Sequence, residues 1–161
     1  MAGSKKFNYL IAKILHWFAG FIIAFNLLSG WRVGDFPEYK HILIMVHSGI
    51  GTTIFLLMLL RWWWRKKNKL YAPPRWWKRP SMVLQWIFYP LLLIQPILGV
   101  GLAAFISYEV LAFGFINYSA LAADSVEMEQ LMFQLHGSTA ILLIILILLH
   151  GMERTKHYFD E

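Results

Sequence analysis

Two histidines, His136 and His150, lie fourteen residues apart in the apolar run from Leu131 to Met152. An α-helix rises about 1.5 Å and turns about 100° per residue, so both imidazoles fall on nearly the same face, about 21 Å apart along the axis. The hydrocarbon core of a bilayer is about 30 Å thick, so a helix that spans it would place one histidine near each boundary. This spacing predicts two separate cofactor sites that share one helix.

The composition predicts an integral membrane protein with a single domain over residues 1–161. Of these residues, 58% are hydrophobic, 17% are aromatic and 15% are charged, which differs strongly from a soluble domain. There are no cysteines, which excludes disulfides, thiolate-bound clusters and covalently attached c-type haem. A bound metal must therefore be held by nitrogen, oxygen or methionine.

Four apolar runs are each long enough to cross a bilayer, which takes about 20 residues in a helix. Only helices and closed barrels satisfy the backbone in hydrocarbon, and continuous apolar runs of this length are typical of helices. The predicted fold class is therefore all-α, a four-helix bundle in the membrane. We expect spans at Leu10 to Leu28, Ile42 to Trp63, Leu84 to Ile106 and Leu131 to Met152.

The basic residues predict the orientation of these spans. Thirteen of the fifteen Lys and Arg residues lie at one end, and only Arg32 and Lys40 lie at the other, which carries six acidic residues. The positive-inside rule assigns the basic end to the cytoplasm, so both termini are expected inside. The net charge of +6 therefore reports topology and contact with membrane lipid, and no nucleic-acid partner is expected.

This topology sorts four histidines into two pairs by depth. His16 and His150 fall on the inner side, and His47 and His136 fall on the outer side. Ionisable groups are costly in hydrocarbon, so two pairs at matching depths indicate a function. A zinc site would need about four donors at one depth, whereas haem needs only two axial nitrogens. We therefore expect a haem at each pair.

Other residues near the span ends fit a haem at each level. The propionates would pair with basic residues, such as Arg61 or Lys13 inside and Arg32 outside. A macrocycle also needs small neighbours, and a small residue lies one turn after three of the histidines, at Gly20, Gly51 and Ala140. The exposed loop position of His41 predicts a solvated residue instead of a ligand.

Several short motifs extend this pattern: His16-Trp17, His47-Ser48-Gly49-Ile50, Arg61 fourteen residues later, Gln95-Pro96-Ile97-Leu98-Gly99, and His136 with His150 followed by His157-Tyr158-Phe159. Over its whole length the chain resembles the bacterial diheme cytochrome b561 family. The resemblance implies a multi-pass protein of the bacterial inner membrane with two haem b groups. It assigns His16 and His150 to the inner iron, and His47 and His136 to the outer iron.

One branch of that family, the superoxide oxidases, passes electrons from superoxide on the outer side to membrane ubiquinone. The resemblance implies a quinone site near Lys78 and His157, and an outer role for Arg32. Gln85 stands where we expect that branch to carry a histidine, and an acidic outer surface slows the approach of an anion. The expected function is electron transfer through two bis-histidine haems to or from quinone, and superoxide–quinone oxidoreductase activity is one hypothesis within it.

Two further hypotheses stay open from the sequence. In the first, the chain is the cytochrome b anchor subunit of a larger respiratory complex, with a protein redox partner docked on the acidic outer segment Tyr108 to Gln130. In the second, the histidines form a proton relay or metal path in a small transporter. Such relays line a polar route, and the spans hold little polar material beyond Asn26, Gln85 and Gln95.

Overall fold

Four long helices form nearly all of the protein. The computed structural model describes the backbone of residues 2–68, 75–78 and 80–159, and the side chains of residues 6–68, 75, 77–78 and 82–152. The helices are α1 (Ala2–Arg32), α2 (Lys40–Lys67), α3 (Pro80–Phe105) and α4 (Val126–Phe159). Each contains an apolar stretch that is long enough to cross a membrane. The fold is therefore an all-α bundle with four candidate spans.

The helix ends carry the residue types that stabilise them. Proline begins α3, where its missing N–H would have no partner in the helix. The Ser125 hydroxyl accepts a hydrogen bond from the backbone N–H of Met128, and two glutamates lie in the first turn of α4. Asn68 ends α2, where its side-chain amide donates to the Trp64 carbonyl at 2.9 Å. The helices are longer than the predicted spans because these polar ends add turns to the apolar runs.

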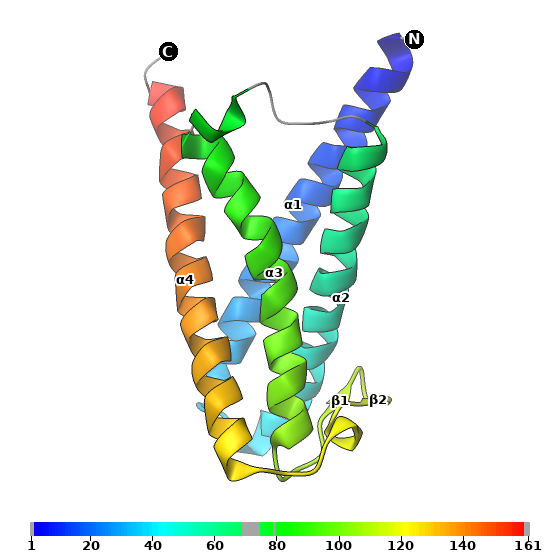
Figure 1. The fold of residues 1–161 in the computed structure, drawn as a ribbon, viewed down its shortest axis with the longest axis vertical. Coiled ribbons are helices and arrows are strands. Elements are labelled where there is room, and N and C mark those ends of the chain that lie inside the picture. The colour runs from blue at the N-terminus through cyan, green and yellow to red at the C-terminus, as the bar shows by residue number, and fades with distance from the viewer. Residues whose placement is uncertain (1, 69–74, 79, 160–161) are drawn as a thin grey trace.

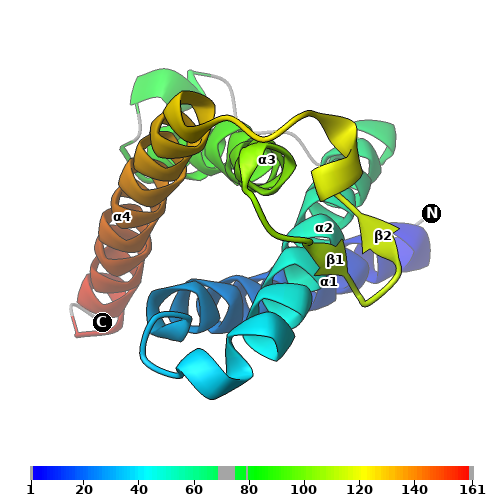
Figure 2. The same cartoon turned by 90° about the horizontal axis from the view of Figure 1, so that it is seen from below.

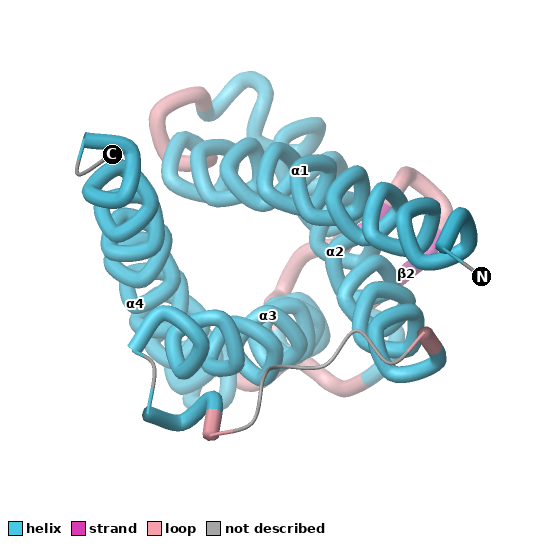
Figure 3. Tube along the Cα trace, turned by 90° about the horizontal axis from the view of Figure 1, so that it is seen from above, coloured by secondary structure: helices cyan, strands magenta, loops and turns pink. Residues whose placement is uncertain are grey.

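The helices follow one another around the bundle in chain order (Figure 3). α2 packs against both α1 and α3, and α3 packs against α4. Both termini lie at the same end of the bundle (Figure 1). An even number of spans requires this arrangement, while its assignment to the cytoplasmic side stays a prediction.

The core is an apolar layer in the middle of the bundle. Leu143 of α4 is 1% exposed and lies seven residues from His136 and seven from His150. All four helices contribute side chains to this layer: Ala19, Ile23, Ile54, Leu57, Met58, Tyr89, Leu92 and Leu143. Many large apolar side chains on the outside of the bundle are exposed, as expected where lipid covers the protein. The core therefore separates the two histidine levels.

A short ribbon departs from the all-helical pattern. β1 (Leu111–Ala112) and β2 (Ile116–Asn117) pair antiparallel in the connection between α3 and α4, with Leu111 opposite Asn117. β1 contacts α2, and the ribbon lies on the outside of the bundle beside that helix (Figure 2). Short 3₁₀ helices at Pro37–Tyr39, Trp76–Lys78 and Ser119–Leu121 complete the connections.

Replacing Leu143 with alanine tests the role of this core. The Leu143→Ala variant removes methyl groups from a packed layer and leaves a cavity, so we expect a loss of roughly 2 kcal/mol or more in the free energy of unfolding. Leu148→Ala in the same helix is the control, because Leu148 is 61% exposed and faces outward. Thermal denaturation in detergent should show a clearly lower midpoint for Leu143→Ala alone. Equal midpoints for the two variants would contradict a packed central layer.

Candidate functional site

The four candidate ligands meet as two pairs of imidazole rings. His47 of α2 faces His136 of α4 with 6.1 Å between ring centres, and the rings are inclined by 81°. His16 of α1 faces His150 of α4 with 6.2 Å between ring centres and an inclination of 88°. All four rings are half-buried. α4 thus contributes one histidine to each pair, two turns on either side of the core.

The separation of the rings suits one metal ion between the two members of a pair. With metal–nitrogen bonds of about 2 Å and about 1.1 Å from nitrogen to ring centre, two imidazoles on opposite sides of a metal have centres about 6 Å apart. Within the described part of the chain, no group of three or more His, Cys, Asp or Glu side chains could hold a metal ion. Two nitrogens per level fit haem, whose porphyrin supplies the other ligands, and do not fit a zinc site.

We name His47 and His136 the outer pair, and His16 and His150 the inner pair, after the sides predicted from the sequence. In the outer pair, the imidazole of His47 is held by α1. Its Nδ1 lies 3.1 Å from the carbonyl oxygen of Asn26 and 3.1 Å from the hydroxyl of Ser29. Ser29 donates its own proton to the same carbonyl at 2.9 Å. Because a carbonyl oxygen only accepts, Nδ1 of His47 is the protonated nitrogen, and Nε2 is left with its lone pair toward the facing ring.

The opposite ring, His136, is held in the same way by α3. Its Nδ1 donates to the carbonyl oxygen of Gln95 at 3.2 Å, while the Gln95 amide donates to the backbone carbonyl of His136 at 3.0 Å. The amide nitrogen also lies 3.4 Å from Nε2 of His136, which marks that ring nitrogen as the acceptor. Both outer histidines therefore present the nitrogen that a metal requires.

Two glycines make these carbonyl contacts possible. A Cβ on Gly30 would lie 2.7 Å from Cε1 of His47, and a Cβ on Gly99 would lie 3.0 Å from Cε1 of His136. Each glycine follows the carbonyl residue by four positions, and a helical side chain covers the turn before its own Cα. A larger residue there would shield the carbonyl of Asn26 or Gln95 from the neighbouring helix.

Gly30 and Gly99, called the cradling glycines below, are not the small residues expected one turn after the ligands. No atom lies within 4 Å of a Cβ built on Gly20, and the nearest to one on Gly51 is the Asn26 amide nitrogen, at 3.7 Å. The sequence signal for the cradle is a polar residue followed four positions later by glycine on a helix beside the ligand. Asn26 with Gly30 has this spacing, as does the Gln95 to Gly99 motif.

Aromatic rings surround the inner pair. The His16 ring lies 5.9 Å from the ring of Trp17, and the His150 ring meets Phe88 edge-on at 5.9 Å. The next residue, Tyr89, is buried in the core. The ring contacts of Trp17 and Phe88 therefore contribute to the surroundings of the inner pair, as the carbonyls of Asn26 and Gln95 do at the outer pair.

A basic and aromatic cluster lies close to the inner pair. Arg65 donates to the hydroxyl of Tyr89 at 3.2 Å, and the guanidinium carbon of Arg61 lies 5.9 Å from the centre of the Tyr89 ring. Arg61 and Arg65 lie in the last two turns of α2, and Phe88, the residue before Tyr89 in α3, contacts the His150 ring. This position suits the expected pairing of Arg61 with an anionic group of a cofactor.

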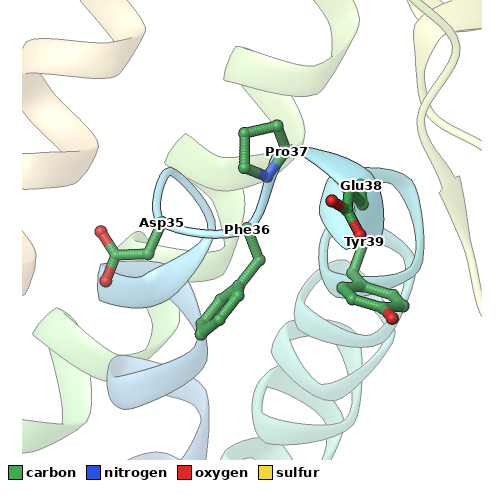
Figure 4. Close-up of a pocket in the computed structure, with 5 residues that line it drawn as sticks. All are labelled: Asp35, Phe36, Pro37, Glu38 and Tyr39. Carbon is green, nitrogen blue, oxygen red and sulfur yellow. The ribbon is translucent and has the colours of Figure 1, made fainter.

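The other predicted basic residue, Arg32, lies at the surface. It forms a 2.9 Å ion pair with Asp35, its side chain is 60% exposed, and its guanidinium carbon lies 5.7 Å from the centre of the Phe36 ring. A pocket beside it is lined by five consecutive loop residues, Asp35, Phe36, Pro37, Glu38 and Tyr39 (Figure 4). This pocket contains none of the paired histidines, and a role for Arg32 in cofactor binding stays a prediction.

The structure describes the side chain of only one of the two proposed quinone residues. Lys78 lies in the 3₁₀ helix Trp76–Lys78, which packs against α3, and its side chain is exposed. The side chain of His157 lies outside the described residues. Their joint role therefore stays a prediction. His41 is exposed, in line with the expected solvated position.

Alanine at the cradling glycines tests the outer site. In Gly30→Ala and Gly99→Ala the new methyl group collides with an imidazole, so we expect His47 or His136 to turn away from its carbonyl and the outer haem to be lost or weakly bound. Gly20→Ala is the control, because the space at its Cβ position is open. Haem per chain is measured from absorption spectra. Retention of all haem in both cradle variants would show that these glycines do not position the ligands.

Comparison with known protein families identifies the family of this chain. The family model described as prokaryotic cytochrome b561 matches residues 9–159, which includes all four paired histidines. No curated protein is significantly similar to the chain. This family implies haem b binding and electron transfer in a membrane, in agreement with four apolar helices and two-nitrogen sites. The chain therefore belongs to the prokaryotic cytochrome b561 family, membrane b-type cytochromes that take part in electron transfer.

Proposed function

We propose that the protein carries electrons between two haem b groups, one held by His47 and His136 and the other by His16 and His150. The observation that carries this proposal is the presence of two facing imidazole pairs, with ring centres 6.1 and 6.2 Å apart, on opposite sides of the core. Haem b supplies reversible one-electron chemistry at its iron when it is bound.

The protein's own residues tune the two sites differently. At the outer site, Nδ1–H of each imidazole donates to a backbone carbonyl, which fixes the ring orientation and raises the basicity of the coordinating nitrogen. At the inner site, Trp17 and Phe88 pack around the ligands and lower the local polarity. The buried apolar layer around Leu143 keeps water out of the space between the levels. These differences are expected to give the two haems different reduction potentials.

Quinone is the proposed partner at the end of the bundle that holds both termini. The positive-inside rule assigns this end to the cytoplasm, since α2 ends there with Arg65, Lys66 and Lys67. The exposed Lys78 lies at the same end, and Arg61 lies in the last two turns of α2 beside the Tyr89 ring. A lysine ammonium is a suitable donor to a quinone carbonyl, and with His157 it would form the proposed binding site.

Superoxide is retained as one proposed electron donor at the opposite end. The only basic side chains there are Arg32 and Lys40, and Arg32 is already paired with Asp35. An anion that approached this end would meet several carboxylates first. A protein redox partner is the other proposed donor, as for a cytochrome b anchor subunit. Rapid mixing of oxidised protein with superoxide distinguishes them, because direct haem reduction needs no second protein.

Histidine substitutions test the pairing of the ligands. The parent should bind about two haems per chain, and alanine at any one of the four ligands should remove about one. The double variant His16→Ala with His150→Ala should lose no more than either single variant, because both residues serve one site, whereas His47→Ala with His150→Ala should lose both haems. His41→Ala is the control and should keep two. Equal losses in the two double variants would refute the pairing.

Substitution of Lys78 tests the quinone site. Dithionite-reduced protein in liposomes is mixed with ubiquinone without oxygen, and haem oxidation is followed by absorbance. Loss of a hydrogen bond from the ammonium group should slow oxidation about tenfold in Lys78→Ala. Lys67→Ala is the matched control, because Lys67 is exposed at the same end and its ammonium lies over the Trp63 ring. Equal rates in both variants would remove Lys78 from the site, and no oxidation of the parent would remove quinone as its partner.

A further inference from the structure

The connection between α3 and α4 contains a long uncharged stretch. Residues 110–123 include no Asp, Glu, Lys or Arg, and Glu109 and Asp124 flank them. Most of the fourteen side chains are apolar, and the stretch contains both the β1–β2 ribbon and the 3₁₀ helix Ser119–Leu121. It lies within the acidic segment Tyr108 to Gln130, whose role in docking a protein partner stays a prediction. Within that segment, Glu109 and Asp124 stand at the two ends of this uncharged stretch.

This element packs along the side of α2. The ring of Phe113 covers Gly49, where a Cβ would lie 2.7 Å from Cδ1 of the ring. The hydroxyls of Tyr118 and Thr52 share a 2.5 Å hydrogen bond. Both contacts hold the ribbon against the outer face of α2, away from the centre of the bundle (Figures 1 and 2).

The contact positions on α2 place the ribbon at membrane depth. Gly49 and Thr52 follow the start of α2 at Lys40 by nine and twelve residues, or about 14 and 18 Å along the helix. Both residues lie inside the candidate span Pro37–Lys67, close to the level of His47. An element that folds back this far along a spanning helix lies beside lipid, where a water-soluble partner does not reach.

The backbone of the ribbon is suited to this environment. The N–H groups of Gly114, Phe115 and Tyr118 donate to carbonyls of the same segment at 3.0 to 3.2 Å. The N–H of Val110 donates to the hydroxyl of Ser119 at 2.8 Å. Non-helical backbone at the edge of the hydrocarbon must have its polar groups paired in this way, because water is scarce there.

The tip of the ribbon carries two stacked aromatic rings that differ in exposure. Phe113 and Phe115 stack with 6.0 Å between ring centres, and they are 46% and 76% exposed. Phe113 and Gly114 both have positive φ angles, 55° and 81°, so a bulky residue occupies a region that usually favours glycine. This strained turn directs one ring onto α2 and leaves its neighbour exposed, and such strain persists where the surroundings hold it.

We propose that the ribbon of residues 110–118 is seated in the membrane interface, with Phe113 and Phe115 in contact with lipid acyl chains. The leaflet is the one opposite the chain termini. Glu109, hydrogen-bonded to Asn117 at the base of the ribbon, stays in the polar headgroup region. The ribbon then anchors the connection and covers α2 at the level of the outer histidine pair. This inference needs only the membrane-spanning fold and is independent of the haem and quinone proposals.

Spin labelling tests this placement, because the chain has no cysteines and each introduced cysteine is the sole labelling site. Phe115→Cys carries a nitroxide in phosphatidylethanolamine–phosphatidylglycerol vesicles. Its collisions with oxygen, which concentrates in lipid, are compared with collisions with water-soluble nickel ethylenediaminediacetate. Leu148→Cys on the outside of α4 is the lipid-facing control, and Glu38→Cys in the loop before α2 is the water-facing control. Leu121→Cys repeats the measurement at a second exposed position.

The expected result is an oxygen-to-nickel collision ratio at Phe115→Cys and Leu121→Cys close to that of Leu148→Cys and well above that of Glu38→Cys. A ratio like that of Glu38→Cys would place the ribbon in water and overturn the proposal. Low collision rates with both reagents would also overturn it, because the label would then be covered by protein, such as a second copy of the chain.

Discussion

Inside a bilayer little water is available to pair polar groups, so hydrogen bonds within the protein strongly stabilise the polar groups that form them. This constraint accounts for the contacts at the outer histidine level. His47 and His136 each donate to a carbonyl of a neighbouring helix, and the amide of Gln95 returns a hydrogen bond to α4. The same hydrogen bonds at Nδ1 leave Nε2 of each imidazole as the unprotonated nitrogen, the form that a metal requires.

The same constraint separates the two ends of the bundle. The outer level is closed in by carbonyl contacts, cradling glycines and the ribbon along α2, so its ligands have little freedom. The inner level relies on aromatic packing and on a cluster of two arginines around Tyr89. A hydrogen-bonded site and a site near two half-buried arginines suit different partners. Between them, Leu143 and its neighbours form a dry layer that isolates each site from the other's solvent.

Much of the fold could be predicted because hydropathy and histidine depth depend on sequence spacing alone. The four spans follow from apolar length, and the pairs of equal depth follow from charge bias and histidine spacing. The family resemblance rests on short motifs around the histidines. The glycine cradle was harder to find, since it depends on which helix face turns toward the ligand. Gly20 lies one turn from His16 yet faces open space, whereas Gly30 lies on a different helix from His47 and touches its ring.

The sequence by itself determined a bundle of four apolar helices, because each of four runs is long enough to cross a bilayer. The fourteen-residue step from His136 to His150 brings both onto one stripe of a helix. The sequence also predicts the chemistry, since histidines paired at two depths in a chain without cysteine fit bis-histidine haem, and the family implies haem b binding. Only the tertiary structure decided which carbonyls orient the ligands and where the uncharged connection lies. Those features depend on helix rotation and on a fold-back along α2, and neither leaves a periodic pattern in the sequence.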